Sequence, residues 1–387
     1  MDRRIFLRSA LVGAGVAAFS GAVWETALAA PAQPGAGPYG PLAAAADGNG
    51  VLLPSGFTSR ILARTNQVVA GTGYRWHGAP DGGACFPNGS GWMYVSNCEL
   101  PLAGGASVLR FDASGTIISA QRLLSGTSGN CAGGPTPWGT WLSCEEHALG
   151  RVWETYPATG ASAVARTAMG RFTHEAAACD PVRQVVYLTE DKSDGCFYRF
   201  RPNTWGDLSS GTLEVLCGPT DSTSGTATWQ RVPNPTSLLR PTRRQVSAAK
   251  HFDGGEGCYY ANGLVWWTTK GDNRVWKLDC ATDAYELAYD DSLVTSGTAP
   301  LTGVDNITGS RSGDLFVAED GGNLEICVIT PDGVVAPFLR LAGHEGSEIT
   351  GPAFSPDGSR LYFSSQRGTS DNSFAGMTFE VKGPFRV

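Results

Sequence analysis

The chain has 387 residues, enough for one large domain or two ordinary ones, and its 51 glycines and 23 prolines indicate many turns. A formal net charge of −7 makes it a poor candidate for nucleic-acid binding. Beyond the N-terminus no apolar run reaches the roughly 18 residues of a membrane span, so we expect no stable membrane anchor.

Residues 1–30 have the features of an export signal. Residues 2–8 match a twin-arginine signal, residues 11–23 are apolar, and residues 27–29 offer a small-residue cleavage site. A short N-terminal anchor helix is the alternative. We therefore predict that residues 1–30 engage the twin-arginine export machinery and that the mature protein is periplasmic or secreted.

The segment that follows, residues 31–50, is rich in alanine, proline and glycine and is predicted to be a linker. Residues 51–387 are predicted to form an all-β domain, a six-bladed β-propeller whose first blade spans residues 51–125. A short apolar strand recurs six times, each copy contains an aromatic residue, and the intervals between successive aromatics are 47, 46, 79, 50 and 46. A period of roughly 40–50 residues is typical of propeller blades with four strands each. The aromatics are Tyr94, Trp141, Tyr187, Trp266, Phe316 and Tyr362.

The longest interval, between Tyr187 and Trp266, contains a predicted insertion at about 205–252, with a short helix from residue 243 to residue 250. It brings together the basic residues Arg240, Arg243, Arg244 and Lys250. A lid for an anionic substrate and an ordinary solvated loop are both compatible with this charge.

Each aromatic strand follows a turn and an earlier strand, which together form a hairpin. Because an antiparallel hairpin places the start of its first strand beside the end of its second, Glu175 should lie beside Asp191. The other copies pair Asn130-Cys131 with Cys144-Glu145-Glu146, Glu256 with Lys270, Asp305-Asn306 with Glu319-Asp320, and Glu348 with Gln366-Arg367. One mouth of the propeller is therefore expected to collect many carboxylates.

Several carboxylates around one axis repel one another, and burial penalises the charge on each. This repulsion can be relieved by protonation of the carboxylates, by water in the mouth or by bound cations. Divalent or trivalent metal ions are the most economical of these possibilities. Oxygen-rich clusters suit calcium, whereas a thiolate with carboxylates suits a transition metal.

The ten cysteines of an exported chain suggest disulfides. Cys85 with Cys98, and Cys131 with Cys144, have the same separation in sequence, and each pair would bridge the strands of one hairpin. The position of Cys144 argues against the second disulfide, because the other copies have Glu190 and Glu319 in this part of the repeat.

Several blocks of sequence resemble a known family, the alkaline phosphatases of the PhoX type. The blocks are Asn130-Cys131-Ala132-Gly133-Gly134, residues 136–141, Cys144-Glu145-Glu146, and residues 170–177. Residues 252–259, 268–273 and 347–367 resemble the shorter branch of that family. The resemblance covers residues 91–368. One departure is Asn97-Cys98-Glu99, where the family often has Asn-His-Glu; a disulfide with Cys85 would explain it.

The resemblance implies a six-bladed propeller that hydrolyses phosphate monoesters outside the cytoplasm with Fe³⁺ and Ca²⁺ ions. It implies Cys144 as the iron thiolate, Glu175 and Glu348 as iron carboxylates, Glu99, Glu145, Glu146 and Asp191 as calcium ligands, and Glu256 as a further metal ligand. We expect a monomer that acts on a small-molecule phosphate ester.

A phosphate dianion can enter an acidic mouth only if metal ions reverse the local charge and activate water. Arg171, Lys270 and Arg367 are candidates for holding the remaining phosphate oxygens, although each could equally form a plain ion pair. His174 is expected to orient a neighbouring group rather than act as a general base. The alternatives are a calcium-dependent, lactonase-like propeller hydrolase and a non-catalytic propeller stabilised by metal.

Overall fold

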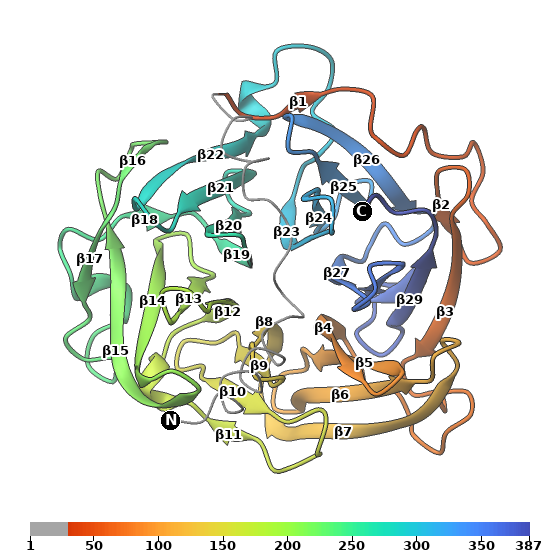
Figure 1. Cartoon of the computed structure of the whole chain (residues 1–387), viewed down its shortest axis with the longest axis horizontal. Coiled ribbons are helices and arrows are strands. Elements are labelled where there is room, and N and C mark those ends of the chain that lie inside the picture. Colours follow the sequence, from red (N-terminus) through yellow and green to blue (C-terminus); the bar gives the residue numbers. More distant parts are fainter. Residues whose placement is uncertain (1–29) are drawn as a thin grey trace, which may run out of the picture.

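The computed structural model describes residues 30–387, so the predicted export signal lies outside the described residues except for its last position. Six sheets stand around a central axis (Figure 1), which confirms the predicted all-β, six-bladed propeller. Residues 30–387 contain no α-helix, only the short 3-10 turns η1 (Thr167–Met169), η2 (Thr242–Arg244), η3 (Asp291–Leu293) and η4 (Gly368–Ser370). None of these helical turns is long and apolar enough to cross a membrane.

Each blade is an antiparallel meander whose first strand lies nearest the axis. Blade 1 contains β4 (Pro80–Asn88), β5 (Gly91–Cys98), β6 (Gly104–Phe111) and β7 (Ile117–Thr127); blade 2 contains β8 (Asn130–Pro135), β9 (Trp141–Glu145), β10 (Val152–Thr155) and β11 (Val164–Ala165). Blade 3 contains β12 (His174–Asp180), β13 (Val185–Glu190), β14 (Gly195–Thr204) and β15 (Asp207–Cys217); blade 4 contains β19 (Gly255–Ala261), β20 (Leu264–Thr269), β21 (Arg274–Asp279) and β22 (Ala284–Asp290). Blade 5 contains β23 (Val304–Gly309), β24 (Leu315–Glu319), β25 (Glu325–Ile329) and β26 (Val334–Leu341); blade 6 contains β27 (Ile349–Phe354), β28 (Arg360–Ser365) and β29 (Met377–Lys382).

The N-terminal strands complete the last blades rather than the first one. β3 (Thr58–Arg64) pairs with β29 as the fourth strand of blade 6, and β2 (Val51–Leu52) pairs with β26 of blade 5. Residues 51–64 therefore do not belong to the first blade, which corrects its predicted start. Residues 31–50 also pack on the propeller, because β1 (Gln33–Pro34) pairs with β26 and Ala32 is 1% exposed.

The insertion begins later than predicted, because β15 continues to Cys217 as the fourth strand of blade 3. After β15 the insertion forms β16 (Gly225–Thr226), which joins blade 4, and β17 (Thr228–Arg231) and β18 (His251–Phe252), which join blade 3. The predicted helix is reduced to the single turn η2. Arg243 pairs with Glu190 at 3.0 Å and Asp194 at 2.7 Å, and Lys250 donates to three backbone carbonyls. These bonds tie the basic side chains to the propeller, which favours a structural role for the insertion over a lid for an anionic substrate.

The hydrophobic core is divided among the interfaces between blades, and the recurring aromatics fill it. Phe197 stacks on Trp267 across blades 3 and 4 with ring centroids 4.2 Å apart. Tyr94 stacks on Tyr362 across blades 1 and 6 at 5.0 Å. Since the apolar side chains pack between the blades, the innermost strands are free to present polar groups to the axis.

Candidate active site

A β-bulge interrupts the pairing of the two innermost strands in every blade. A bulge inserts one extra residue and re-aims the side chains beside it, and bulges are common next to active sites. In blades 1 to 5 the bulge begins with a potential metal ligand. Together with their counterpart in blade 6, these residues form the inner ring: Asp81, Cys131, Glu175, Glu256, Asp305 and Thr350.

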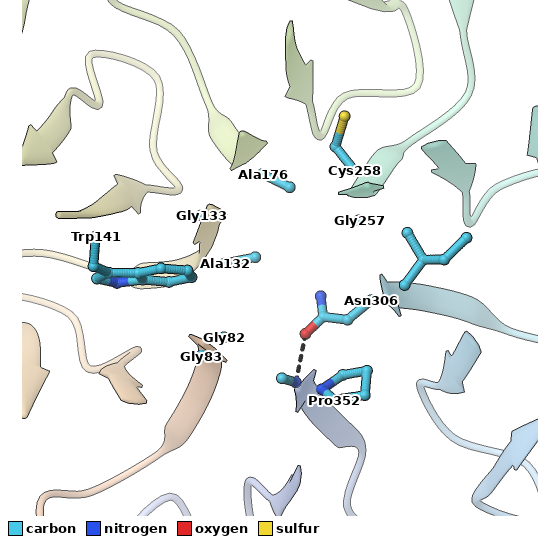
Figure 2. Close-up of a pocket in the computed structure, with 12 residues that line it drawn as sticks. Gly82, Gly83, Ala132, Gly133, Trp141, Ala176, Gly257, Cys258, Asn306 and Pro352 are labelled. Atoms are coloured by element: carbon cyan, nitrogen blue, oxygen red, sulfur yellow. Dashed lines mark hydrogen bonds between the residues drawn. The ribbon is translucent and has the colours of Figure 1, made fainter. Parts of the chain in front are cut away.

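The residue after each inner-ring position is small in most blades, and these residues lie where neighbouring inner strands come close together. Gly82, Ala132, Ala176, Gly257 and Asn306 line a cavity of about 40 Å³ (Figure 2). A Cβ atom on Gly82 would lie 2.5 Å from the Cα of Ala132, and one on Gly257 would lie 2.6 Å from the backbone nitrogen of Ile307. Larger side chains would push the inner strands apart.

A second layer lies where each second strand ends. In each blade a backbone N–H at this point donates to a carbonyl two residues before the inner-ring position, so the two layers are held in register. We call these residues the outer ring: Glu99, Glu146, Asp191, Lys270, Asp320 and Gln366. In blade 6 the carbonyl belongs to Glu348, whose side chain supplies the carboxylate that Thr350 lacks.

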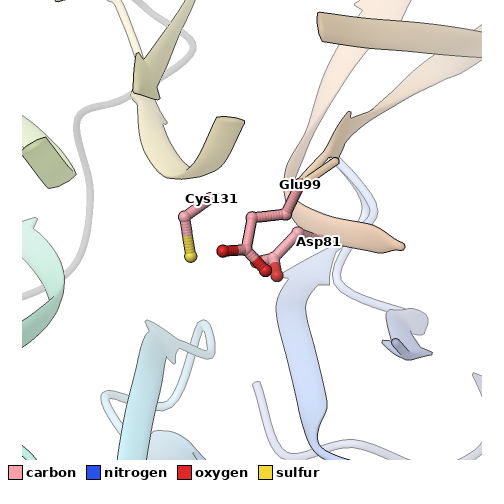
Figure 3. Close-up of side chains that lie close together, drawn as sticks. All are labelled: Asp81, Glu99 and Cys131. Atoms are coloured by element: carbon pink, nitrogen blue, oxygen red, sulfur yellow. The ribbon is translucent and has the colours of Figure 1, made fainter. Parts of the chain in front are cut away.

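The thiol of Cys131 lies at the centre of the acids of blades 1 to 3. Ligand atoms of Asp81, Glu99 and Cys131 lie within 4.8 Å of one another (Figure 3), and so do those of Cys131, Glu146 and Glu175. The Cys131 thiol donates to Oε1 of Glu175 at 3.3 Å. A single sulfur atom thus borders two groups of possible metal ligands.

The neutral side chain of Gln366 organises the first of these groups. Its Nε2 donates to Oδ2 of Asp81 and to Oε2 of Glu99, both at 2.6 Å. Its Oε1 accepts from Nη1 of Arg367 at 3.1 Å. Gln366 therefore fixes two carboxylates and one guanidinium relative to each other.

The acids of blades 4 to 6 meet two cations. Lys270 Nζ lies 3.0 Å from Glu256, 3.3 Å from Asp320 and 3.8 Å from Asp305. Arg367 lies 2.8 Å from Glu348 and 3.5 Å from Asp320. Ligand atoms of Glu175, Glu256 and Asp305, and those of Asp305, Asp320 and Glu348, also lie within 4.8 Å of one another.

Burial sets the protonation of these groups when no metal is bound. Burial, reinforced by the charge of Glu99, raises the pKa of Glu146 to about 9. Burial raises the pKa of Asp305 to about 7, although Lys270 opposes the shift. Burial is also the main cause that raises the pKa of the Cys131 thiol. Without bound cations, Glu146 therefore keeps its proton at neutral pH.

The residues present fit metal ions. Oε2 of Glu175 is buried and has no hydrogen-bond partner within residues 30–387, which is costly unless a cation binds there. The surrounding donors are carboxylate oxygens, which suit calcium, and one thiol, which suits iron.

The structure places Cys144, the predicted iron thiolate, away from this site. Its side chain is buried in the apolar core between blades 2 and 3, beside Val152 and Phe172. Cys144 lies inside β9, where its side chain packs in the apolar core, whereas Glu146 follows the end of that strand. All ten cysteines are free, so the structure contains neither the suggested Cys85–Cys98 disulfide nor the Cys131–Cys144 disulfide that the sequence already disfavours. Cys85 lies opposite Tyr94 rather than Cys98.

Glu145 braces its own blade instead of facing the axis. Its carboxylate accepts the backbone N–H groups of Ser128 at 3.2 Å and Arg151 at 3.1 Å. The equivalent Glu319 likewise accepts the N–H groups of Thr302 and Glu325. These glutamates satisfy loop amides, so the predicted calcium ligand Glu145 is a structural group.

Within residues 30–387 no hydrogen bond or ion pair joins two further candidates, His174 and Arg171, to the acids of the rings. His174 is fully buried, packs against Phe172 with ring centroids 3.6 Å apart, and donates a hydrogen bond from Nε2 to the Gly170 carbonyl at 3.1 Å. Burial lowers the pKa of His174 to about 3. The guanidinium of Arg171 forms no hydrogen bond or ion pair with any residue in the described range 30–387.

Sequence reasoning leaves Asp81 out of the site and does not select Cys131, Asp305 or Asp320 as ligands. A local signal does exist for the inner ring. It is an acid or cysteine followed at once by a small residue, as in Asp81-Gly82 and Cys131-Ala132, because the bulge brings the second residue against the next blade.

The comparisons with known proteins agree with this geometry. The family model described as alkaline phosphatase PhoX matches residues 93–162 and 148–368, more than half of the chain. No curated protein matches the sequence significantly.

Among solved structures, the chain is similar to Pseudomonas fluorescens PhoX in complex with vanadate, a transition state analogue. The TM-score is 0.73 at 17% identity over 88% of this chain and 97% of that chain. A Bacteroides thetaiotaomicron protein of unknown function gives a TM-score of 0.52 at 8% identity, covering 84% of this chain and 76% of the other. A Xanthomonas campestris gluconolactonase gives only 0.46 at 14% identity, covering 90% and 99%. The first two of these similarities show the fold. From the family match we conclude that the chain belongs to the alkaline phosphatase PhoX family and is a phosphoric monoester hydrolase of the alkaline phosphatase type.

Proposed function

We propose that this phosphatase depends on iron and calcium held by the two rings at the propeller mouth. Cys131 replaces Cys144 as the iron ligand, with Glu175 beside it and Glu146 within reach of both. Asp81 and Glu99 fit calcium because carboxylate oxygens are its preferred ligands. The observation that carries the proposal is the orphaned Oε2 of Glu175 next to the only thiol of the rings.

When bound, the metal ions would neutralise phosphoryl charge and lower the pKa of a water molecule. The chain itself orients the ester. Arg367 is 27% exposed at the side chain and lies at the rim, where its guanidinium can bind phosphate oxygens without leaving Glu348.

We further propose that the substrate is a small phosphate monoester and that the protein works outside the cytoplasm as a monomer. The twin-arginine features of residues 2–29 support export. A mouth lined by acids suits a compact ester whose charge the metal ions neutralise, and it would repel an extended polyanion such as nucleic acid.

The two cysteines provide the test. Cys131→Ser should lose iron and lower kcat on p-nitrophenyl phosphate by at least about 100-fold, because even indirect supports of a metal site contribute 10- to 100-fold. Cys144→Ser, the matched control, should keep its iron and most of its activity. Elemental analysis and initial rates are the measurements. Activity that survives exhaustive metal removal would overturn the proposal.

A further inference from the structure

The outer ring contains one positively charged residue at a position where most blades have a carboxylate. Blades 1, 2, 3 and 5 place a carboxylate at this position, whereas blade 4 places Lys270 there. Its ammonium lies 3.0 Å from Glu256, 3.3 Å from Asp320 and 3.8 Å from Asp305. The amine therefore occupies a cage of three carboxylates from two adjacent blades, an arrangement that also suits a divalent cation.

The second cation of the mouth lies on the same side. Arg367 pairs with Glu348 at 2.8 Å and with Asp320 at 3.5 Å, so Asp320 is shared between it and Lys270. The acids of blades 4 to 6 are thus compensated by the chain's own side chains.

The opposite side has no such compensation. Within the described residues, none of the acids of blades 1 to 3 in the two rings forms an ion pair with a lysine or arginine; these acids are Asp81, Glu99, Glu146, Glu175 and Asp191. Gln366 contributes only a neutral amide to Asp81 and Glu99. Glu175, whose Oε2 has no hydrogen-bond partner within residues 30–387, lies between the two sides, because it belongs both to the group with Cys131 and Glu146 and to the group with Glu256 and Asp305.

We propose that Lys270 is a built-in cation that fills one metal position between blades 4 and 5 and confines the metal ions to the side of Cys131. Calcium needs oxygen ligands at about 2.3–2.6 Å, and the ammonium already holds those oxygens and would repel a second cation a few ångströms away. The proposal rests on the metal dependence proposed above and specifies where the metals bind.

Two substitutions test the role of Lys270. Lys270→Met removes the charge at similar length, and Lys270→Glu gives blade 4 the carboxylate found in blades 1 and 2. After equilibration with iron and calcium and removal of free metal, both variants should contain about one more divalent ion per chain than the wild type. Calcium should also raise their Tm more than it raises the wild-type Tm. The control is Lys277→Met, since Lys277 pairs with Glu286 at 2.6 Å on the outer strands of the same blade, and its metal content should not change.

The outcomes separate this inference from the proposed function. An unchanged or lower metal content in folded variants overturns the inference, as does a raised KM for p-nitrophenyl phosphate at unchanged metal content, which would make Lys270 a substrate ligand. Variants that fold only with calcium present support it, whereas variants that fail to fold even with calcium count against it. A wild-type protein that binds no metal overturns the proposed function itself.

Discussion

The task of a residue in the mouth depends on the direction in which its side chain leaves the strand. Glu145 and Glu146 are neighbours in sequence, yet the first accepts backbone amides within its blade and the second lies beside Cys131. A one-residue step along a strand reverses the direction of the side chain. Adjacent acids in such a pair therefore have different tasks, and substitutions should distinguish them.

Glu175→Gln should abolish turnover while the fold is retained. Glutamine has nearly the same shape as glutamate. Its amide, however, carries no negative charge and is a poor metal ligand at the position of the orphaned oxygen. We expect a loss of bound metal and a fall in kcat, measured by elemental analysis and by hydrolysis of p-nitrophenyl phosphate. Glu286→Gln, on an outer strand, is the control. A folded Glu175→Gln protein with a normal rate would remove this residue from the site.

Glu145→Gln should show the opposite behaviour. It weakens the charge-assisted hydrogen bonds to the amides of Ser128 and Arg151, so the free energy of unfolding should fall by about 1–2 kcal/mol. Metal content should stay at the wild-type level, because this carboxylate faces away from the rings. Denaturant melts and elemental analysis give the two readouts, and loss of one metal ion would return Glu145 to the list of ligands.

At the level of structural elements, the six bulges decide which side chains reach the axis. The hairpin pattern predicts which strand ends meet, and the structure gathers most of the predicted mouth residues there: Glu99, Glu146, Glu175, Asp191, Glu256, Lys270, Glu348 and Arg367. The pattern cannot reveal the extra residue in each inner strand, since alternation by two assumes regular pairing. Regular alternation therefore gives no reason to choose Cys131 or Asp81, and it leaves Cys144 as a candidate.

The close packing behind the bulges should tolerate no added methyl group. In Gly257→Ala the new Cβ would lie 2.6 Å from the backbone nitrogen of Ile307 and 2.8 Å from the Cα of Asn306. We expect the free energy of unfolding to drop by about 1–3 kcal/mol, with reduced metal content because the inner ring is displaced. Gly48→Ala has open space around its Cβ position and should leave both quantities unchanged. Equal stability of the two variants would show that the inner strands have room to move.

At the level of the whole molecule, the number of blades follows from the six copies of the repeat, but the way in which the ring closes does not. The strands β2 and β3 lie near the start of the chain and pair with β26 and β29 near its end, and no local pattern indicates such a partner. For the same reason the sequence places the start of the first blade too early and makes the packed segment 31–50 resemble a linker. Long-range pairing is determined by the remaining open edge of the sheet rather than by the strand's own sequence.

Metal removal should make stability depend steeply on pH. In the metal-free fold the pKa of Glu146 is raised from 4.5 to about 9 and that of Asp305 from 3.8 to about 7. Between about pH 4 and pH 9 the folded state then holds more protons than the unfolded state. The contribution of these two groups to the free energy of unfolding should therefore be highest below about pH 4 to 4.5. It should fall as the pH rises towards 9.

Thermal melts of chelator-treated protein across this range are the measurement, with metal-loaded protein as the control. Bound cations replace the protons, so the loaded protein should lose much less stability over the same interval. A metal-free protein whose Tm rises steadily from pH 5 to pH 9 would contradict the arrangement of buried acids.

The pairing of β3 with β29 also has a consequence for biosynthesis. β3 is synthesised long before its partner β29, so the circle of blades stays open until β29 has left the ribosome. The carboxylates of the mouth come from every blade, and a nascent chain cannot bring them together. Assembly of the mouth therefore follows the synthesis of the sixth blade, and a chain truncated shortly before Met377 would have an exposed sheet edge and no finished pore.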